Sequence, residues 1–415
     1  MRLIYNIGIR LYWLAARIIS PWNRKAKLWI QGRKRWLEEL QQALDPEDRV
    51  IWFHCSSLGE FEQGRPVIES FRTRFPDHKI LLTFFSPSGY EKRKNYPGAD
   101  HVMYLPLDTR RNARKLIGST SMEMALFVKY EFWYHFLYRL KSEEIPIFLI
   151  SGNFRPGQLF FKWYGGWYRR FLDFFEQIYV QKEDSKQLLK SVGFDRVTVA
   201  GDTRFDRVHQ LAKTEYRNQA LEGFTEGANV IVAGSTWEKD ELILEHAFHK
   251  LPVETRWIIA PHELSESHIL SLKRRFPSSV LFSELAHEIP PHIRVVIVDT
   301  IGQLSYLYRF GTIAYIGGGF GKGIHNTLEP VTYGVPVLFG PVYDKFAEAV
   351  ELIRLGGAYP VHDRDGILST IRQQLHNPKL LKTSSQIAGK YVQERVGATL
   401  IILDEVCKKL KRNMF

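Results

Sequence analysis

From residue 49 onward, short runs of apolar residues alternate along the chain with longer stretches whose apolar positions recur at helical spacing. The first series of runs, rich in Val and Ile, covers residues 50–54, 80–84, 124–128, 147–150 and 197–200. The second series covers residues 230–233, 257–260, 295–298, 312–316 and 335–339. This alternation is typical of parallel sheets covered by helices. We therefore predict an α/β fold with two Rossmann-like, doubly wound domains that face a cleft.

The length of 415 residues also favours two domains, because one ordinary hydrophobic core does not extend over so long a chain. A polar stretch, residues 207–228, separates the two series of strands and is interpreted as a linker. The predicted domains cover residues 37–206 and 229–384. A C-terminal helical segment, residues 385–415, is expected to pack back on the first domain.

The N-terminal segment, residues 1–36, differs from the rest of the chain in charge. It contains nine basic residues and no acidic ones, so the remainder carries only about +3 of the net charge of +12. On a helix, Arg2, Asn6, Arg10 and Arg17 share one narrow face, and apolar residues occupy the rest. This pattern predicts a basic amphipathic segment that anchors the protein to an anionic membrane surface, with the cluster 24–35 on the headgroups.

Two alternatives to a membrane anchor exist for this segment. A helix packed on the protein's own core is the stronger one. A nucleic-acid-binding arm is disfavoured, because such arms rarely carry so much aliphatic and aromatic surface, and we predict no nucleic-acid partner. A second aromatic and basic stretch, residues 160–170, fits a membrane contact or a buried aromatic helix equally well.

Metal-binding patterns are weak in this sequence. Asp363-Arg364-Asp365 has a D-x-D form, but a helical pattern follows it, so Asp365 is expected to be a helix N-cap. His262-Glu263 lacks the second histidine of H-E-x-x-H. The two cysteines, Cys55 and Cys407, lie too far apart in sequence for a metal site or a disulfide framework. We predict neither a catalytic metal nor a cofactor.

The stretch Y-I-G-G-G-F-G-K-G-I-H-N-T-L-E-P, residues 315–330, follows a predicted strand. Its spacing matches neither the P-loop nor the Rossmann fingerprint. Glycines at a strand end, followed by a helix that starts near Asn326, nevertheless favour a phosphate site made of backbone N–H groups and a helix N-terminus. A glycine-rich turn without a ligand is the alternative.

Other strand ends carry small or polar residues as well. H-C-S-S-L-G-E, residues 54–60, follows the first strand and places Glu60 at the start of a helix, where the dipole favours a carboxylate. A purely capping glutamate would fit this motif too. In the second half, A-G-S-T (233–236) and P-H-E (261–263) follow strands. Together with the glycine stretch, they predict a nucleotide pocket.

These motifs, with Y-E-F-W (130–133), G-D-T-R-F-D (201–206) and the continuation of the glycine stretch to P-V-T-Y-G-V-P-V-L-F-G-P, occur in a characteristic order. The chain resembles the bacterial 3-deoxy-D-manno-octulosonic acid (Kdo) transferases of lipopolysaccharide biosynthesis over nearly its whole length. The resemblance implies a GT-B architecture and a glycosyltransferase that moves Kdo from CMP-Kdo to a lipid A precursor. It also implies inversion at the anomeric carbon, without a metal, at the cytoplasmic face of the inner membrane.

The resemblance also assigns roles by position. Glu60 matches the family's catalytic base, and the residues matched to the acceptor side are Ser56, Ser57, Gly59 and Glu131. The residues matched to donor binding are Arg204, Ser235, Thr236, His262, Gly317, Gly318, Gly319, Lys322, His325, Asn326 and Glu329. The sequence departs from the family pattern at three positions, because Lys129 replaces an acid, His262 replaces an arginine and Arg204 replaces a lysine.

Other functions share parts of this pattern. Another GT-B transferase or a sugar-nucleotide epimerase would have the same cleft but would not need an amphipathic N-terminus. A non-catalytic membrane-associated protein on this fold is disfavoured by the presence of Glu60 and Glu329.

Overall fold

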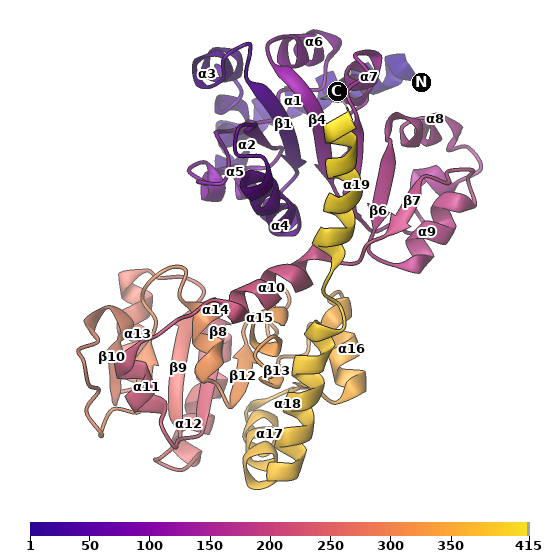
Figure 1. Cartoon of the computed structure of the whole chain (residues 1–415). Helices are drawn as coiled ribbons and strands as arrows, with labels where there is room; N and C mark the ends of the chain where they lie inside the picture. The colour runs from indigo at the N-terminus through magenta and orange to yellow at the C-terminus, as the bar shows by residue number, and fades with distance from the viewer. Residues whose placement is uncertain (413–415) are drawn as a thin grey trace. The chain divides into compact units, whose positions relative to one another are not determined.

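The structure of this protein, a computed structural model, describes residues 1–412 and divides into two compact units (Figure 1). The first unit consists of Met1–Asp206 together with the chain from Val396 onward, and the second consists of Arg207–Arg395. Each unit contains one seven-stranded sheet in which every neighbouring pair of strands is parallel. The α/β fold class inferred from the alternating pattern is confirmed.

The first sheet has the strand order β3-β2-β1-β4-β5-β6-β7. Its strands are β1 (Arg49–Cys55), β2 (Lys79–Phe84), β3 (His101–Tyr104), β4 (Ser121–Val128), β5 (Ile147–Gly152), β6 (Gln177–Val180) and β7 (Val197–Val199). The helices of this unit are α1 (Arg2–Ile19), α2 (Arg24–Gln31), α3 (Trp36–Ala43), α4 (Leu58–Arg74), α5 (Pro87–Arg93), α6 (Arg110–Gly118), α7 (Tyr134–Ser142), α8 (Gly166–Arg169), α9 (Glu183–Lys190) and α19 (Ala398–Arg412), with short 3₁₀ turns η1 (Leu159–Phe161) and η2 (Leu172–Phe174).

Both faces of the first sheet are buried, which explains why its strands read as continuous apolar runs. Side chains alternate along β1: Trp52 packs into the core beneath α3, α6 and α7, and Phe53 packs into the core beneath α4 and α19. The last helix described, α19, contributes Ile402, Val406 and Leu410 to that second core, and Figure 1 shows it in yellow among the indigo and purple elements of the first unit.

The second sheet has the order β10-β11-β9-β8-β12-β13-β14. Its strands are β8 (Val230–Thr236), β9 (Arg256–Pro261), β10 (Ser279–Leu281), β11 (Val295–Ile297), β12 (Ile313–Ile316), β13 (Val337–Phe339) and β14 (Ala358–Pro360). The helices of this unit are α11 (Gln219–Thr225), α12 (Glu238–Lys250), α13 (Glu266–Arg275), α14 (Leu304–Leu307), α15 (Leu328–Val331), α16 (Ala347–Leu355), α17 (Arg364–His376) and α18 (Pro378–Gln393), with 3₁₀ turns η3 (Phe282–Glu284) and η4 (Tyr308–Phe310). Helix α10 (Thr203–Lys213) runs across the division at Asp206.

The division into units differs in detail from the ranges expected from sequence. Residues 207–228 are not an extended linker, because α10 and α11 occupy much of this stretch and Leu221 and Phe224 are buried. The second unit continues to Arg395 rather than 384, since α18 buries Tyr391 and Val392. The helix that belongs to the first unit is α19.

Helix α1 packs against the first unit along one edge and exposes its other sides. The Tyr5 hydroxyl donates a hydrogen bond to the buried carboxylate of Asp108, and His135 donates from Nε2 to Asn6 Oδ1, at 2.6 Å. No residue of α1 is fully buried, and large apolar side chains such as Leu3 and Ile18 remain exposed. Among residues 1–412, no helix is both long enough and apolar enough to cross a bilayer.

The basic cluster expected on lipid headgroups is smaller in the structure than in the sequence. The guanidinium of Arg33 is buried, where it donates to the carbonyl oxygens of Leu105, Trp29 and Phe85 at 2.7, 2.8 and 2.7 Å. Burial lowers the pKa of Arg33 to about 9, so the group still carries its charge at neutral pH. Arg33 is therefore a structural residue of the first unit, and Trp29, 4 % exposed, packs with it.

The aromatic stretch 160–170 contains both buried and exposed rings. Phe160 belongs to the core of the first unit, and Trp167 contacts Tyr5 of α1 with ring centroids 5.8 Å apart. Trp163, in contrast, is 90 % exposed. Part of this stretch is therefore buried as one interpretation expects, and membrane contact by its exposed part stays a prediction.

Candidate functional site

Residues selected from sequence lie at the carboxyl ends of strands in both sheets, where parallel α/β domains bind their ligands. In the first unit they follow β1 and β4, which are neighbours in the sheet. In the second unit they follow β8, β9 and β12, three adjacent strands.

Glu60 lies in the first turn of α4, directly after β1. The Ser57 hydroxyl donates a hydrogen bond to Glu60 Oε2, and the ammonium of Lys129 is 4.0 Å from Glu60 Oε1. The glutamate side chain is 18 % exposed. A negative charge here faces the positive end of the α4 dipole and the lysine, while the open position leaves the carboxylate accessible to a substrate. Lys129 has a left-handed backbone (φ 72°), which turns the chain sharply after β4.

Glu131 belongs to a buried hydrogen-bond network. Its Oε2 atom accepts from Trp133 Nε1 at 2.7 Å and lies 3.0 Å from His54 Nε2. His54 Nδ1 is 2.8 Å from the Thr83 hydroxyl, which accepts from Trp52 Nε1 at 2.8 Å. One arrangement satisfies every group: Trp52 donates to Thr83, Thr83 donates to His54 Nδ1, and His54 Nε2–H donates to Glu131.

Because of this network, Glu131 is less accessible than a residue assigned to acceptor binding is expected to be. The residue is only 8 % exposed, and one carboxylate oxygen is engaged within the unit. Its sequence motif gave no sign of His54 as a partner, because 77 positions separate the two. Glu131 and Glu60 nonetheless lie in the same region, since both add to the effect of burial in raising the pKa of Cys55 well above its ordinary value.

The other first-unit residues take different places. The carbonyl oxygen of Ser56 accepts from Ser86 N–H at 2.7 Å, which ties the end of β1 to the loop after β2. At Gly59 an added Cβ would meet nothing closer than Ser57 Oγ at 3.9 Å, so no close contact requires glycine there. Arg204, assigned to the donor, lies in the first unit at the start of α10, with its guanidinium Nη2 2.7 Å from Asp202 Oδ2.

In the second unit, the glycines after β12 allow close contact between backbone segments. A Cβ added at Gly317 would lie 2.2 Å from the carbonyl oxygen of Ser235, and one at Gly319 would lie 2.5 Å from the nitrogen of Gly340. Gly318 has a left-handed backbone (φ 90°). Packing within the unit therefore accounts for these three glycines without a ligand.

The expectation of bare N–H groups in this loop is wrong for most of its glycines. The N–H of Gly318 donates to Asp240 Oδ2 at 2.9 Å, and that of Gly317 donates to the Gly234 carbonyl at 2.9 Å. The N–H groups of Gly321 and Gly323 both donate to the Gly318 carbonyl. Most N–H groups of this loop are engaged by carbonyl oxygens of the unit or by the buried carboxylate of Asp240. The loop therefore lacks the free N–H groups of the predicted phosphate site.

Asp240 is a site residue that sequence reasoning missed. It is 1 % exposed, accepts from the Tyr315 hydroxyl at 2.7 Å, and accepts from the N–H of Trp237 at 2.9 Å in addition to that of Gly318. The available signal was its place three residues after Trp237, where an acid commonly caps the helix start. Its bond to Gly318, 78 positions away, had no local signal.

The helix expected from Asn326 is also shorter than predicted. Helix α15 (Leu328–Val331) has only four residues, and its first N–H group donates to Asn326 Oδ1 at 3.1 Å. The Asn326 side-chain amide in turn donates to Glu329 Oε1 at 3.0 Å. Asn326 and Glu329 are thus brought together, and a polar pair takes the place of an open helix N-terminus.

Three rings assemble at the ends of β8, β9 and β12. The imidazole of His262 stacks on Trp237 and on His325, with ring centroids 4.6 and 4.4 Å apart. The indole N–H of Trp237 lies 3.1 Å from His325 Nε2, and the planes of these two rings are within 15° of parallel. Lys322 is exposed in the adjacent glycine loop. The structure therefore brings two imidazoles and a loop lysine to this edge, and sequence reasoning missed Trp237.

Ser235 and Thr236 differ in accessibility. Ser235 has a left-handed backbone (φ 54°) at the point where the register between β8 and β9 shifts. Thr236 is completely buried, and its hydroxyl donates to Glu241 Oε1 at 3.0 Å. Its side chain therefore supports the end of β8 from within the unit instead of facing a ligand, contrary to the role assigned from sequence.

The described residues contain no group of three or more His, Cys, Asp or Glu side chains arranged to hold a metal ion. In the D-x-D stretch, Asp363 is the cap of α17, since its Oδ1 accepts from Gly366 N–H at 2.7 Å. The expectation that Asp365 would be the N-cap is wrong by two residues.

Two domains that each contain such a parallel sheet are characteristic of the GT-B fold. Solved structures confirm this fold class. The calicheamicin glycosyltransferase CalG4 superimposes with a TM-score of 0.55 at 12% identity, covering 88% of this chain and 99% of that one. The UDP-GlcNAc 2-epimerase from Neisseria meningitidis, solved with UDP-GlcNAc bound, gives a TM-score of 0.57 at 18% identity, covering 87% of this chain and all of that one.

Sequence comparisons identify the relatives more narrowly. Residues 33–207 match the family model described as 3-deoxy-D-manno-octulosonic-acid transferase (kdotransferase). The 3-deoxy-D-manno-octulosonic acid transferase of Chlamydia muridarum is 27% identical over 80% of this chain and 80% of its own length. That of Aquifex aeolicus is 27% identical over 83% of this chain and 92% of its own. The chain is thus similar in sequence to the Kdo transferases, and the resemblance inferred from its motifs is confirmed.

Proposed function

We propose that this protein is an inverting glycosyltransferase that moves Kdo from CMP-Kdo to a lipid A precursor during lipopolysaccharide assembly. The observation that carries the proposal is Glu60, an accessible carboxylate beside Lys129 in the part of the chain that matches the family model. The relatives' activity supports Kdo transfer, and the charged groups at the two sheet edges supply the chemistry.

In the proposed reaction, an acceptor hydroxyl attacks the anomeric carbon of Kdo from the face opposite the phosphate. Glu60 takes the hydroxyl proton as the new carbon–oxygen bond forms, and the bond to the phosphate oxygen breaks so that CMP departs. A single displacement of this kind inverts the configuration. The Glu60 carboxylate that accepts the proton lies at the N-terminus of α4, 4.0 Å from the ammonium of Lys129.

The leaving CMP needs positive charge or hydrogen-bond donors near its phosphate. The loop amides are mostly engaged, so we assign this role to side chains, namely Lys322, His262 and His325. These groups stabilise the departing phosphate directly, and the proposed step therefore needs no metal. Glu329, held by Asn326, is assigned to the ribose hydroxyls.

A product assay tests the proposal. Purified protein is incubated with CMP-Kdo and a tetra-acylated lipid A precursor, with and without a chelator, and the product is analysed by mass and by NMR of the anomeric centre. We expect a Kdo-bearing lipid of inverted configuration in both conditions. No Kdo transfer would reject the proposed function, retained configuration would reject the single displacement, and loss of activity with chelator would reject metal independence.

We further propose that the first unit lies on the cytoplasmic face of the inner membrane. Helix α1 exposes Leu3, Ile4, Ile7, Leu11 and Ile18, while Arg10 and Arg17 on the same helix are also exposed. Apolar insertion together with attraction between basic residues and anionic lipid gives reversible membrane attachment. An enzyme with a lipid acceptor needs such a surface to reach its substrate in the bilayer.

Exposed side chains of α1 offer a test that leaves its packing intact. The double variant Leu11→Ser/Leu14→Ser removes apolar surface but keeps Tyr5 and its bond to Asp108. We expect weaker co-sedimentation with anionic vesicles and unchanged CMP binding. Leu270→Ser, at a leucine that is 52% exposed on α13 of the second unit, is the matched control. If full-length protein stayed in the supernatant at low salt, the membrane proposal would be rejected.

A further inference from the structure

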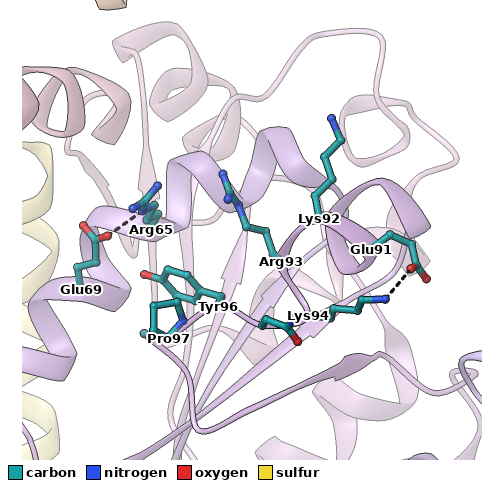
Figure 2. A pocket seen from close by; sticks show the side chains of 10 residues that line it. Arg65, Glu69, Glu91, Lys92, Arg93, Lys94, Tyr96 and Pro97 are labelled. Atoms are coloured by element: carbon teal, nitrogen blue, oxygen red, sulfur yellow. Dashed lines mark hydrogen bonds and ion pairs between the residues drawn. The ribbon is translucent and has the colours of Figure 1, made fainter. Parts of the chain in front are cut away.

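Two of the hollows on the first unit differ in how many of their basic residues form ion pairs. The hollow in Figure 2, of about 450 Å³, lies between α4 and the end of α5. In it Arg65 Nε is 2.7 Å from Glu69 Oε1 and Lys94 Nζ is 3.3 Å from Glu91 Oε2. Its third paired cation, Arg93, is bound to the neighbouring Glu62 at 2.8 Å. Three of its four cations are therefore held in ion pairs, and Lys92 is the fourth.

The second hollow lies at the carboxyl ends of β5 and β6 and has a volume of about 680 Å³, within the range of ligand sites. Its basic residues, Arg155 and Lys182, are exposed, and neither forms an ion pair with another of the described residues. Asp184 is the acidic residue of its lining. Within the described part of the chain, neither cation of this lining is held in an ion pair, and its one carboxylate is that of Asp184.

The second hollow lies next to the proposed catalytic base. The Tyr130 hydroxyl donates to the carbonyl oxygen of Asn153, which lines the hollow. Lys129 Nζ lies 5.7 Å from the Tyr130 ring centroid and 4.0 Å from Glu60. Burial raises the pKa of Tyr130, Arg155 opposes this rise, and Glu60 adds to it. One tyrosine therefore lies within electrostatic reach of both the base and the hollow.

The same hollow adjoins the exposed aromatic stretch. Phe154, in its lining, packs edge-on against Phe160 and Phe161, with ring centroids 6.0 and 6.1 Å apart. Trp163, two residues beyond Phe161, is 90 % exposed. If the aromatic stretch contacts the bilayer, the hollow lies close to where lipid headgroups are found.

We propose that this hollow binds a phosphate monoester on the sugar headgroup of the lipid acceptor, through Arg155 and Lys182. The inference rests on the proposed function and names a subsite for its acceptor. A phosphate monoester carries between one and two negative charges at neutral pH, and two unpaired cations complement it. The planar guanidinium of Arg155 can donate two parallel hydrogen bonds to phosphate oxygens, and Lys182 adds a point charge. Bound there, the headgroup is held beside Glu60.

The test uses full-length protein with two acceptors, a phosphorylated lipid A precursor and the same lipid with its phosphates removed, both in detergent micelles. For Arg155→Gln and Lys182→Gln we expect the KM for the phosphorylated acceptor to rise about tenfold, because a charge-assisted contact is lost. The KM for CMP-Kdo and the kinetics with the dephosphorylated acceptor should not change. Asp184→Asn should act in the opposite direction and lower the KM for the phosphorylated acceptor.

Lys92→Gln is the matched control, since it removes one positive charge from the hollow in Figure 2. It should leave both acceptor KM values unchanged. Equal effects of Arg155→Gln on both acceptors, or equal effects of Lys92→Gln and Lys182→Gln, would overturn the proposal. Inorganic phosphate that inhibited transfer to both acceptors equally would also overturn the proposal, because the hollow would then be a site for free phosphate.

The phosphate subsite can be tested separately from Kdo transfer. If the protein did not transfer Kdo at all, binding of a phosphorylated glucosamine disaccharide could still be titrated by NMR against wild type and Arg155→Gln. Tighter binding by the wild type would support the subsite even then. Equal binding by the two proteins would reject it.

Discussion

Glu60 and Asp240 hold matching positions in the two units, yet their surroundings differ. Each lies in the first turn of the helix that follows a central strand, β1 in one sheet and β8 in the other. Glu60 is partly exposed and has Ser57 and Lys129 beside it. Asp240 is 1 % exposed, and three donors from its own unit share its two oxygens. A carboxylate at this place after a strand can be reactive or structural. The number of hydrogen-bond donors from its own unit decides which of the two it is.

The first prediction concerns Glu60. The variant Glu60→Gln should lose on the order of a hundredfold or more in transfer rate, because an amide cannot take the acceptor proton. CMP binding and the melting temperature should stay near those of the wild type. Steady-state kinetics and CMP titration are the measurements, with Glu62→Gln on the same helix as control. Turnover close to that of the wild type would remove Glu60 as the base.

The second prediction concerns Asp240, where stability should suffer. Asp240→Ala leaves the N–H groups of Gly318 and Trp237 and the hydroxyl of Tyr315 without their acceptor, and unfolding free energy should fall by roughly 2 to 4 kcal/mol. CMP affinity should fall with it as the glycine loop loosens. Denaturant unfolding measures the first effect. A variant as stable as wild type would show that the loop does not depend on this carboxylate.

The third prediction concerns Glu329, which is accessible where Asp240 is not. Glu329→Ala should weaken CMP binding by roughly 1 to 3 kcal/mol, because ribose hydroxyls lose an acceptor. Its effect on CMP should equal its effect on cytidine, since both carry the ribose. Calorimetric titration with the two ligands is the check, and unchanged affinity for cytidine would exclude contact with the ribose.

The fourth prediction concerns the charge on the glycine loop. Lys322→Ala should weaken CMP about fivefold and cytidine hardly at all, since an exposed lysine contributes a single contact to phosphate. The ratio of the two affinities is the informative quantity. Equal loss for both ligands would show that Lys322 acts on the loop instead of the phosphate.

Sequence pattern predicted the strands that lie inside each sheet better than those at the edges. The runs that became β1, β4, β8 and β12 are mostly apolar because both faces of these strands are buried. The strands missed in the first unit were β3, at an edge, and β6, which has only four residues. In the second unit the missed strands were β10 and β14, the two edge strands. The missed edge strands all contain partly exposed residues, so their sequences are less apolar than those of the strands inside the sheets.

The sequence motifs predicted the residues of the site, but they did not predict the hydrogen-bond partners that lie far away in the sequence. Glu60 could be found because its position depends on a local turn between strand and helix. The bond from Gly318 to Asp240 joins residues far apart in sequence, so the glycines were interpreted as open to a ligand although the protein's own groups occupy most of them. Arg33 was counted with the headgroup cluster for a similar reason, since its carbonyl partners on Phe85 and Leu105 lie in other parts of the chain.

The place of α19 has a consequence for how the chain folds as it is synthesised. Ile402, Val406 and Leu410 fill a core whose other members, such as Ile51 and Phe71, leave the ribosome hundreds of residues earlier. The second unit is complete once Arg395 has emerged. A nascent chain can therefore finish its second unit while the apolar surface beneath α19 is still uncovered, although α4 already packs on the same core. During that interval the uncovered face is a natural binding surface for chaperones, and premature termination before α19 would leave it uncovered permanently.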